Sequence, residues 1–150
     1  MNQTNDATGE IDVATASPQD LVDMSYRLIS FAAGGEPSWD LFRQLFSDRA
    51  VFALRILPTD ESISIFTLDE FVRHFARAEM KESGYEERPL ERSINVMGDL
   101  AEVHARFQMY VGTRHIGDAI DIFQVVRRGG RWSIVSLTSE VFGHQAAYES

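Results

Sequence analysis

The chain has 150 residues, 44% of them hydrophobic and 25% charged, a composition typical of one globular domain. Its 14 lysines and arginines against 23 aspartates and glutamates give a net charge of −9, which disfavours nucleic acids and anionic membranes as partners. The absence of cysteine excludes disulfides, thiolate nucleophiles and cysteine-ligated metals. Because no apolar run is long enough to span a membrane and the N-terminus lacks the pattern of a secretion signal, we expect a soluble, cytoplasmic protein.

The first half of the chain is predicted to be mainly helical. Residues 1–16 are small and polar, and we expect them to form a disordered tail. Ser17, which is followed by Pro18, begins the first helix, and Gly34-Gly35 ends it. A shorter helix is predicted over 37–46. Thr67 caps a third helix, which continues as far as Gly84.

The second half is predicted to be mainly strands. Residues 50–57 are rich in apolar and β-branched residues and indicate a first strand, and from 87 to 142 the chain has a strand-like pattern. The turn signals within this part are Gly98-Asp99, 112–117 and Gly129-Gly130. The order of elements predicts an α+β fold, with three N-terminal helices packed on one face of a strongly curved antiparallel sheet. The domain is expected to cover 17–142, followed by a C-terminal tail over 143–150.

The predicted strands carry apolar residues on both faces. In the strand around 119–127, Phe123 lies on one face, whereas Ile120 and Ile122 lie on the other. Helices can cover only one face of a sheet, so we expect a second copy of the chain to cover the outer face in a homodimer. The alternative is a C-terminal segment that folds back over the sheet.

Three segments resemble a known superfamily. They are Trp39 to Ala50 (WDLFRQLFSDRA), Ile120 to Phe123 (IDIF) and Gly129 to Val135 (GGRWSIV). In their order along the chain they resemble the nuclear-transport-factor-2-like (SnoaL-like) superfamily, over roughly residues 18–142. The resemblance implies a cone-shaped α+β barrel. It implies no particular reaction, because the superfamily contains isomerases, dehydratases, epoxide hydrolases and noncatalytic binding proteins.

Asp121 is the most informative single residue. It interrupts an apolar strand, where a carboxylate needs a partner or a proton. The segment around it is similar to the strand of ketosteroid isomerase that carries a protonated, hydrogen-bond-donating aspartate. The same resemblance places Tyr26 where that enzyme has its oxyanion-hole tyrosine, so the two residues could polarise a carbonyl or hold a phenol-like ligand. The alternative is that Asp121 pairs with an arginine or across the dimer, and that Tyr26 belongs to the core.

The position of the isomerase's catalytic base is occupied by a residue that cannot act as one. The resemblance places that base at Leu54, and leucine cannot carry a proton. Arg55 is next to it, but in a regular strand its side chain points to the other face, and it stays charged at neutral pH. We therefore expect no ketosteroid isomerase activity.

The strand over 100–111 offers two faces, and sequence arguments about them conflict. Burial alone places the alternating apolar residues from Ala101 to Val111 inside. A four-residue hairpin loop at 113–116 would instead place Gln108 opposite Asp121. In that register, which we favour, His104 and Arg106 line one polar pocket with Asp121, and His104 is available as a general base.

The functional expectations combine these residues with an apolar pocket. The residues expected to line the pocket, beyond those named above, are Trp39, Phe42, Phe71, Phe75, Tyr85 and Phe123. The first hypothesis is a noncatalytic or weakly catalytic site for a small apolar or cyclic molecule, with no cofactor. The second is an isomerase or dehydratase-like lyase that acts on a cyclic or carbonyl-bearing metabolite, with His104 and Asp121 as catalytic groups. The third is a noncatalytic assembly domain. The four histidines lack metal-ligand spacing, so no metal site is predicted.

Overall fold

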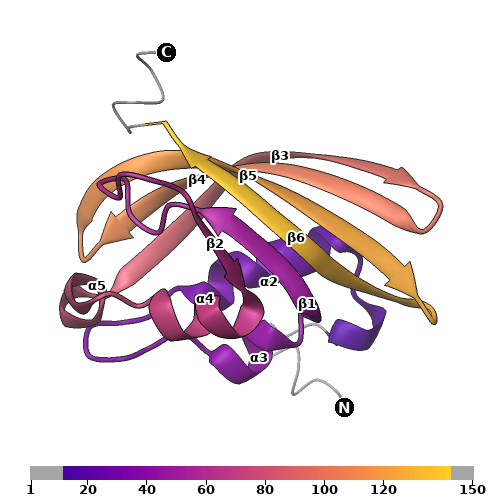
Figure 1. The fold of residues 1–150 in the computed structure, drawn as a ribbon, viewed down its shortest axis with the longest axis horizontal. Helices are drawn as coiled ribbons and strands as arrows, with labels where there is room; N and C mark the ends of the chain where they lie inside the picture. The colour runs from indigo at the N-terminus through magenta and orange to yellow at the C-terminus, as the bar shows by residue number, and fades with distance from the viewer. Residues whose placement is uncertain (1–11, 143–150) are drawn as a thin grey trace.

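The computed structural model describes residues 12–142, which form a layer of helices beneath a bent sheet (Figure 1). The helical elements are η1 (Val13–Thr15), α2 (Pro18–Ile29), α3 (Trp39–Arg43), α4 (Leu68–His74) and α5 (Ala78–Ser83). The strands are β1 (Phe46–Leu54), β2 (Ser64–Thr67), β3 (Tyr85–Met97), β4 (Leu100–Val111), β5 (Arg114–Arg128) and β6 (Arg131–Val141). The predicted α+β class is confirmed, with four α-helices in place of three.

Two helices begin at the predicted capping residues. The Ser17 hydroxyl accepts a hydrogen bond from the backbone N–H of Asp20, whose carboxylate accepts one from the N–H of Ser17 (3.1 and 3.2 Å). Thr67 and Glu70 make the same reciprocal pair at the start of α4 (3.1 and 2.9 Å). Each pair satisfies backbone donors that have no partner within the helix. Both predicted helix starts are therefore confirmed.

The predicted third helix is interrupted. α4 ends at His74 and α5 begins at Ala78, because Arg77 has an extended backbone (φ −71°, ψ 162°) that a helix cannot continue. Its guanidinium donates to both carboxylate oxygens of Asp60, at 3.1 and 2.9 Å. α5 then ends at Gly84 as predicted, where φ is +86° and a Cβ would lie 2.9 Å from the backbone nitrogen of Ala33.

The sheet has the strand order β2-β1-β6-β5-β4-β3. All neighbouring strands are antiparallel except β1 and β6, which run parallel. The sheet is therefore mixed, whereas an antiparallel one was predicted. The predicted turns join β3 to β4, β4 to β5 and β5 to β6. The middle turn, at residues 112–113, is tighter than the 112–117 segment that the sequence suggested.

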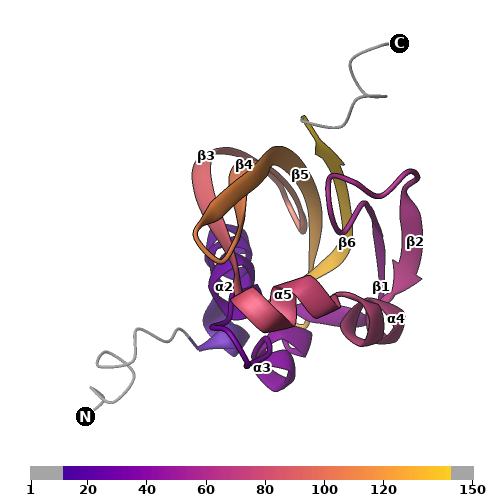
Figure 2. The same ribbon diagram turned by 90° about the vertical axis from the view of Figure 1, so that its left-hand side faces the viewer.

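The sheet curves over the helices, so one face is inner and the other outer (Figure 2). Along β4 every second residue from Ala101 to Val111 is buried on the inner face. On β5 the inner residues include Ala119, Asp121 and Phe123, all buried. The core therefore lies between this inner face and the helices.

Part of the predicted N-terminal tail belongs to the domain. Val13 and Ala16 are buried in the core, and the Asp12 side chain accepts a hydrogen bond from the N–H of Ala14 at 3.0 Å. The prediction of a tail is therefore wrong for residues 12–16, because the side chains of Val13 and Ala16 pack in the core. Residues 1–11 and the predicted C-terminal tail at 143–150 lie outside the described residues.

Candidate functional site

A small cavity, which we call the central hollow, lies between the helices and the inner face of the sheet. Its lining is mainly apolar, with several aromatic rings, and comes from helices α2, α3 and α4 and from strands β1, β3, β4, β5 and β6. The phenylalanines of this lining are Phe42, Phe46, Phe71, Phe75, Phe107 and Phe123. Its free volume, counted as the space open to the centre of a water-sized sphere, is about 40 Å³. One water needs about 10–15 Å³ on this measure, so the hollow has room for a few waters or a very small molecule.

Asp121 is one of two acids in this lining. It lies on β5 with 4% of its surface exposed, and its strand neighbours are Ala105 and Ser139. The Tyr26 hydroxyl on α2 donates to its Oδ2 at 2.8 Å. The structure therefore brings together Tyr26 and Asp121. Tyr26 itself does not line the hollow: its ring packs tilted against Phe107 and edge-on against Phe123, with centroids 5.3 and 6.1 Å apart.

Glu87 is the second acid, and sequence analysis missed it. Residues 81–88 have the composition of a solvated connection, but β3 already begins at Tyr85. Tyr85 and Glu87 thus share the inner face, and the Tyr85 hydroxyl donates to Glu87 Oε2 at 2.7 Å. The backbone N–H of Glu87 donates to Ser30 Oγ at 3.1 Å. The available signal was alternation, since Glu86 and Arg88 on either side are exposed.

Burial sets the protonation of both acids. Loss of hydration raises the pKa of Asp121 to about 7, although hydrogen bonds from Ser139 and Tyr26 act in the opposite direction. Loss of hydration and then the charge of Asp121 raise the pKa of Glu87 to about 8, against the hydrogen bond from Tyr85. The pair therefore holds protons near neutral pH, where ordinary surface carboxyls are ionised.

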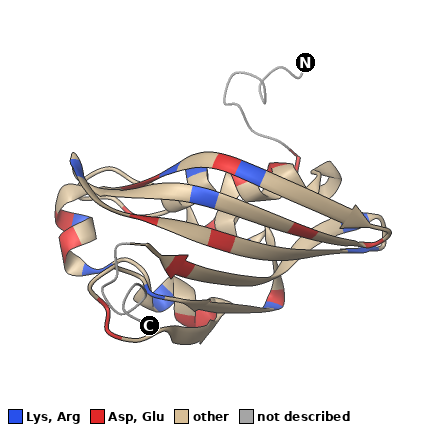
Figure 3. Ribbon diagram, turned by 90° about the horizontal axis from the view of Figure 1, so that it is seen from above, with Lys and Arg blue, Asp and Glu red and all other residues tan. Residues whose placement is uncertain are grey.

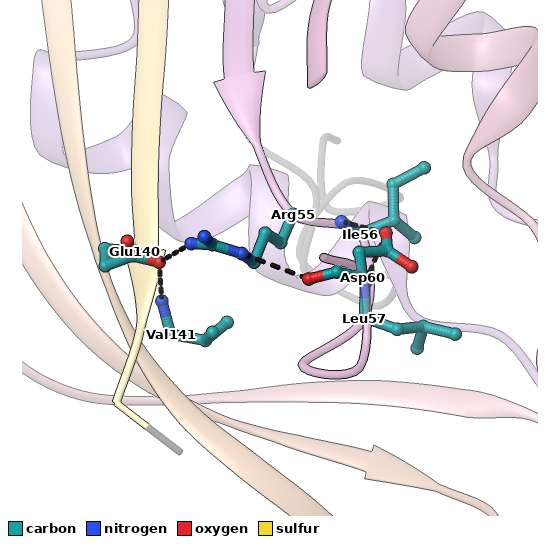
Figure 4. A network of polar contacts seen from close by, with 6 residues as sticks. All are labelled: Arg55, Ile56, Leu57, Asp60, Glu140 and Val141. Atoms are coloured by element: carbon teal, nitrogen blue, oxygen red, sulfur yellow. Dashed lines mark hydrogen bonds and ion pairs between the residues drawn. The ribbon is translucent and has the colours of Figure 1, made fainter. Parts of the chain in front are cut away.

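The guanidinium of Arg55, which belongs to the lining, pairs with groups other than Asp121 and Glu87. Arg55 lines the hollow, contrary to the expectation that it points to the other face, because β1 ends at Leu54 and strand alternation stops there. Figure 4 shows its guanidinium paired with the Glu140 carboxylate. Its Nε donates to the backbone oxygen of Asp60 at 3.1 Å. The Asp60 carboxylate in turn accepts the N–H groups of Ile56 and Leu57 (3.1 and 3.3 Å), which fixes the loop after β1.

The polar pocket of His104, Arg106 and Asp121 does not form. Asp121 lies opposite Ala105, whereas Gln108 lies opposite Asp118. The prediction failed because the turn is only two residues long and the register shifts between Met109 and Tyr110.

The three predicted polar residues of β4 lie on the outer face. His104 Nε2 is 3.2 Å from Glu102 Oε1, and Arg106 lies over the ring of Phe142. Gln108 shares this face and lies beside Arg88 of β3. None of the three lines the central hollow, so His104 cannot act together with Asp121 on one small ligand.

Most of the apolar residues predicted to line the pocket do line the central hollow, and one packs behind it. Leu54, Phe71, Phe75 and Phe123 line the hollow. Trp39 does not. Its ring packs edge-on against three phenylalanines, with centroids 5.4 Å from Phe42 and 6.2 Å from Phe71 and Phe75.

Neither a metal cluster nor a membrane helix occurs within residues 12–142. In this part of the chain no three histidine, aspartate or glutamate side chains gather in a way that could hold a metal ion. Nor is any helix there long and apolar enough to cross a bilayer.

Comparison with known proteins finds similarity in fold. No protein-family model and no curated protein matches the sequence. An NTF2-like protein with a cystatin-like fold from Novosphingobium aromaticivorans is 13% identical, with a TM-score of 0.63 over 85% of this chain and 80% of that one. An NTF2-like protein of unknown function from Silicibacter pomeroyi is 17% identical, with a TM-score of 0.60 over 94% and 99%. A Catenulispora acidiphila protein in complex with S-DNPA is 14% identical, with a TM-score of 0.62 over 86% and 93%.

These likenesses extend over most of the chain and concern its backbone. The cystatin-like fold of the Novosphingobium aromaticivorans protein agrees with the α+β fold that the sequence resemblance implied. A fold of this kind accommodates many unrelated sites. The chain has the NTF2-like, cystatin-like α+β fold.

Proposed function

We propose that the central hollow binds a small, mostly apolar molecule and holds one polar group of that molecule at Asp121 and Glu87. The observation that supports this is a pair of acids, Asp121 buried and Glu87 half-buried, in a mostly apolar lining. Apolar pockets with a few converging polar groups are typical of small-molecule sites, and acids with strongly shifted pKa values often mark them. The S-DNPA complex of the Catenulispora acidiphila protein is consistent with a ligand site in this fold.

The free space limits the ligand. About 40 Å³ accommodates only a few atoms, so anything larger has to displace side chains or open the loop after β1. Arg55 belongs to that loop and is tied to Glu140 on β6. If no molecule enters, the third hypothesis applies, in which the protein's own side chains fill the cone and the domain serves assembly.

Thermal unfolding in the presence of small aromatic and alicyclic compounds tests the proposal. A ligand that binds the folded protein raises the unfolding temperature. We expect at least one compound to stabilise the wild type and Glu102→Gln, a variant with a changed carboxylate on the outer face, but not Asp121→Asn. Equal shifts in both variants, or no shift with any compound, contradict the proposal.

A second candidate is proton transfer on a bound carbonyl compound, in the manner of an isomerase or lyase. It is favoured by the pKa of about 7 at Asp121, which suits a group that gives and takes protons at neutral pH. Deuterium uptake from heavy water into the α-carbons of 2-butanone, followed by NMR, tests it. We expect Asp121→Asn to abolish protein-dependent exchange. Exchange no faster than in buffer alone contradicts the proposal.

We also propose that two copies associate through the outer face. Ile122 lies there between His104 and Thr138 and is only partly buried in one chain. Figure 3 shows charges of both signs spread along the long strands, which a second copy can match. Analytical ultracentrifugation should give a dimer for the wild type and a monomer for Ile122→Glu. A monomeric wild type contradicts this.

A further inference from the structure

The lining of the central hollow contains two acids without a neighbouring cation. Asp121 and Glu87 face the hollow from β5 and β3. The polar groups that face them are the hydroxyls of Tyr26 and Tyr85, together with Ser25 of α2 and Ser139 of β6. Among the described residues that line the hollow, Arg55 is the one side chain with a positive charge.

Arg55 does not compensate these acids. Its guanidinium is paired with Glu140, whose side chain is 40% exposed, and with the backbone oxygen of Asp60. Figure 4 shows the ion pair with Glu140, a residue that is not part of the lining. Consistent with this, no positive charge contributes to the pKa of Asp121 or Glu87, which burial raises.

A buried carboxylate (Asp121) and a half-buried one (Glu87) in an apolar hollow without a counter-charge are unfavourable, so positive charge has to enter the hollow when both ionise. Protons supply it when no ligand is present. A divalent metal ion is a poor substitute, because it prefers about six oxygen ligands and keeps its waters, whereas most of this lining is apolar and includes six phenylalanines. An alkylammonium ion suits the lining better, since its N–H groups can donate to two carboxylates while its alkyl part contacts aromatic rings.

We propose that the central hollow recognises a small organic ammonium ion, with its charged nitrogen held between Asp121 and Glu87 and its alkyl part against the phenylalanine lining. This inference rests on the proposed ligand site and adds the charge and the chemical class of the ligand. Neutral molecules of the same size are then weaker ligands, because they leave the two acids either protonated or unpaired.

Binding of an ammonium ion must compete with protons for the same two groups. Because the pKa values of Asp121 and Glu87 are raised to about 7 and about 8, the wild type has to release protons when it binds the ion near pH 7. An alkylammonium itself stays charged up to about pH 10, as the lysine side chain does. Affinity should therefore increase from about pH 6 to about pH 9.

The test compares isopropylammonium chloride with isopropanol, which has the same shape and no charge, and with sodium chloride at the same ionic strength. Isothermal titration calorimetry and thermal unfolding are measured on the wild type, Glu87→Gln, Asp121→Asn and the outer-face control Glu102→Gln. We expect at least about tenfold tighter binding of the ammonium than of the alcohol, and about tenfold loss in either inner variant. Titration in buffers of different ionisation enthalpy should show proton release in the wild type, a measurement that needs no variant to fold.

The outcomes separate this inference from the proposed function. Equal affinity for isopropanol and isopropylammonium overturns the ammonium preference and leaves a small-molecule site. Stabilisation that sodium chloride reproduces, or that persists in both Glu87→Gln and Asp121→Asn, also overturns it, because the ion then binds elsewhere. If the ammonium does not bind but a neutral compound from the screen does, the inference is wrong. If nothing binds, the proposed function fails with it.

Discussion

The two faces of β4 and β5 contain similar residue types in opposite environments. On the outer face the Glu102 carboxylate lies beside His104, and both side chains are more than two-fifths exposed. On the inner face Asp121 is buried against Tyr26 and has no neighbouring cation. Water screens the outer pair, so its contribution to stability is small. The same chemical group becomes a proton-holding acid on the inner face only because water is excluded.

This contrast shows that the face of the strand, not the residue type, determines the chemistry here. His104 is the residue that sequence reasoning favours as a base, but it faces outward. Glu87 looks like part of a solvated charge run, but it faces the hollow.

The largest expected effect comes from removing an inner ring. Phe123→Ala on β5 should destabilise the protein by about 3–5 kcal/mol, because it removes a fully buried side chain and leaves a cavity. Gln124→Ala, one position along on the exposed outer face, should change stability by less than about 0.5 kcal/mol. Urea unfolding of both variants measures the difference. Similar losses in the two variants would show that the two faces are not distinct in packing.

The pH dependence of stability should differ between the inner and outer acids. The pKa of Asp121 is raised to about 7 from 3.8, so the folded protein holds a proton that the unfolded chain has lost. Its contribution is complete below about pH 4 and is lost as the pH rises through about 7. Asp121→Asn cannot lose that proton, so its stability relative to the wild type should improve by about 1–3 kcal/mol between about pH 5 and about pH 8.

The outer-face control for this experiment is Glu102→Gln. Its stability relative to the wild type should stay nearly constant over the same pH range, because the Glu102 side chain is exposed to water and screened by it. A parallel pH profile for Asp121→Asn and Glu102→Gln, measured by chemical unfolding at each pH, would mean that Asp121 is ionised in the folded protein at all these pH values.

The two tyrosine hydroxyls provide a smaller and more specific comparison. Tyr26→Phe removes the donor to Asp121 Oδ2, and Tyr85→Phe removes the donor to Glu87 Oε2. Each should cost about 1–2 kcal/mol, because a buried acceptor loses its partner. Both should also raise the pKa of the acid concerned, since each hydrogen bond stabilises the ionised form. NMR titration of the labelled carboxyl carbons checks this, and a lowered pKa would contradict it.

Much of the fold could be predicted from local chemistry. The caps at Ser17 and Thr67, the stop at Gly84 and the turn glycines each require particular residue types, so they are visible in sequence. The parallel pairing of β1 with β6 could not be predicted, because it joins strands far apart in the chain. The break before α5 was also missed, since it depends on the tertiary ion pair between Arg77 and Asp60.

The site was predicted in part for a similar reason. Asp121 is visible because it interrupts an apolar strand, and the sequence resemblance suggested Tyr26 beside it. The assignment of His104 depended on hairpin register, and a single irregularity between Met109 and Tyr110 reverses the two faces. Glu87 could be recognised only after the start of β3 was known. Side chains alternate between the two faces of a strand, so the face of Glu87 depends on the residue at which the strand begins.

The smallest effect is expected for His104, the residue on which the predicted catalytic pocket depended. His104→Gln should change stability by less than about 0.5 kcal/mol, because the ring is exposed and its Glu102 partner is screened by water. It should also leave ligand binding in the central hollow unchanged, since none of its atoms lines that hollow. Titration of one compound that binds the wild type, measured in parallel for His104→Gln and Asp121→Asn, checks both faces in one experiment. Loss of binding in His104→Gln with retention in Asp121→Asn would mean that the outer face, where a second copy is proposed to lie, is the functional one.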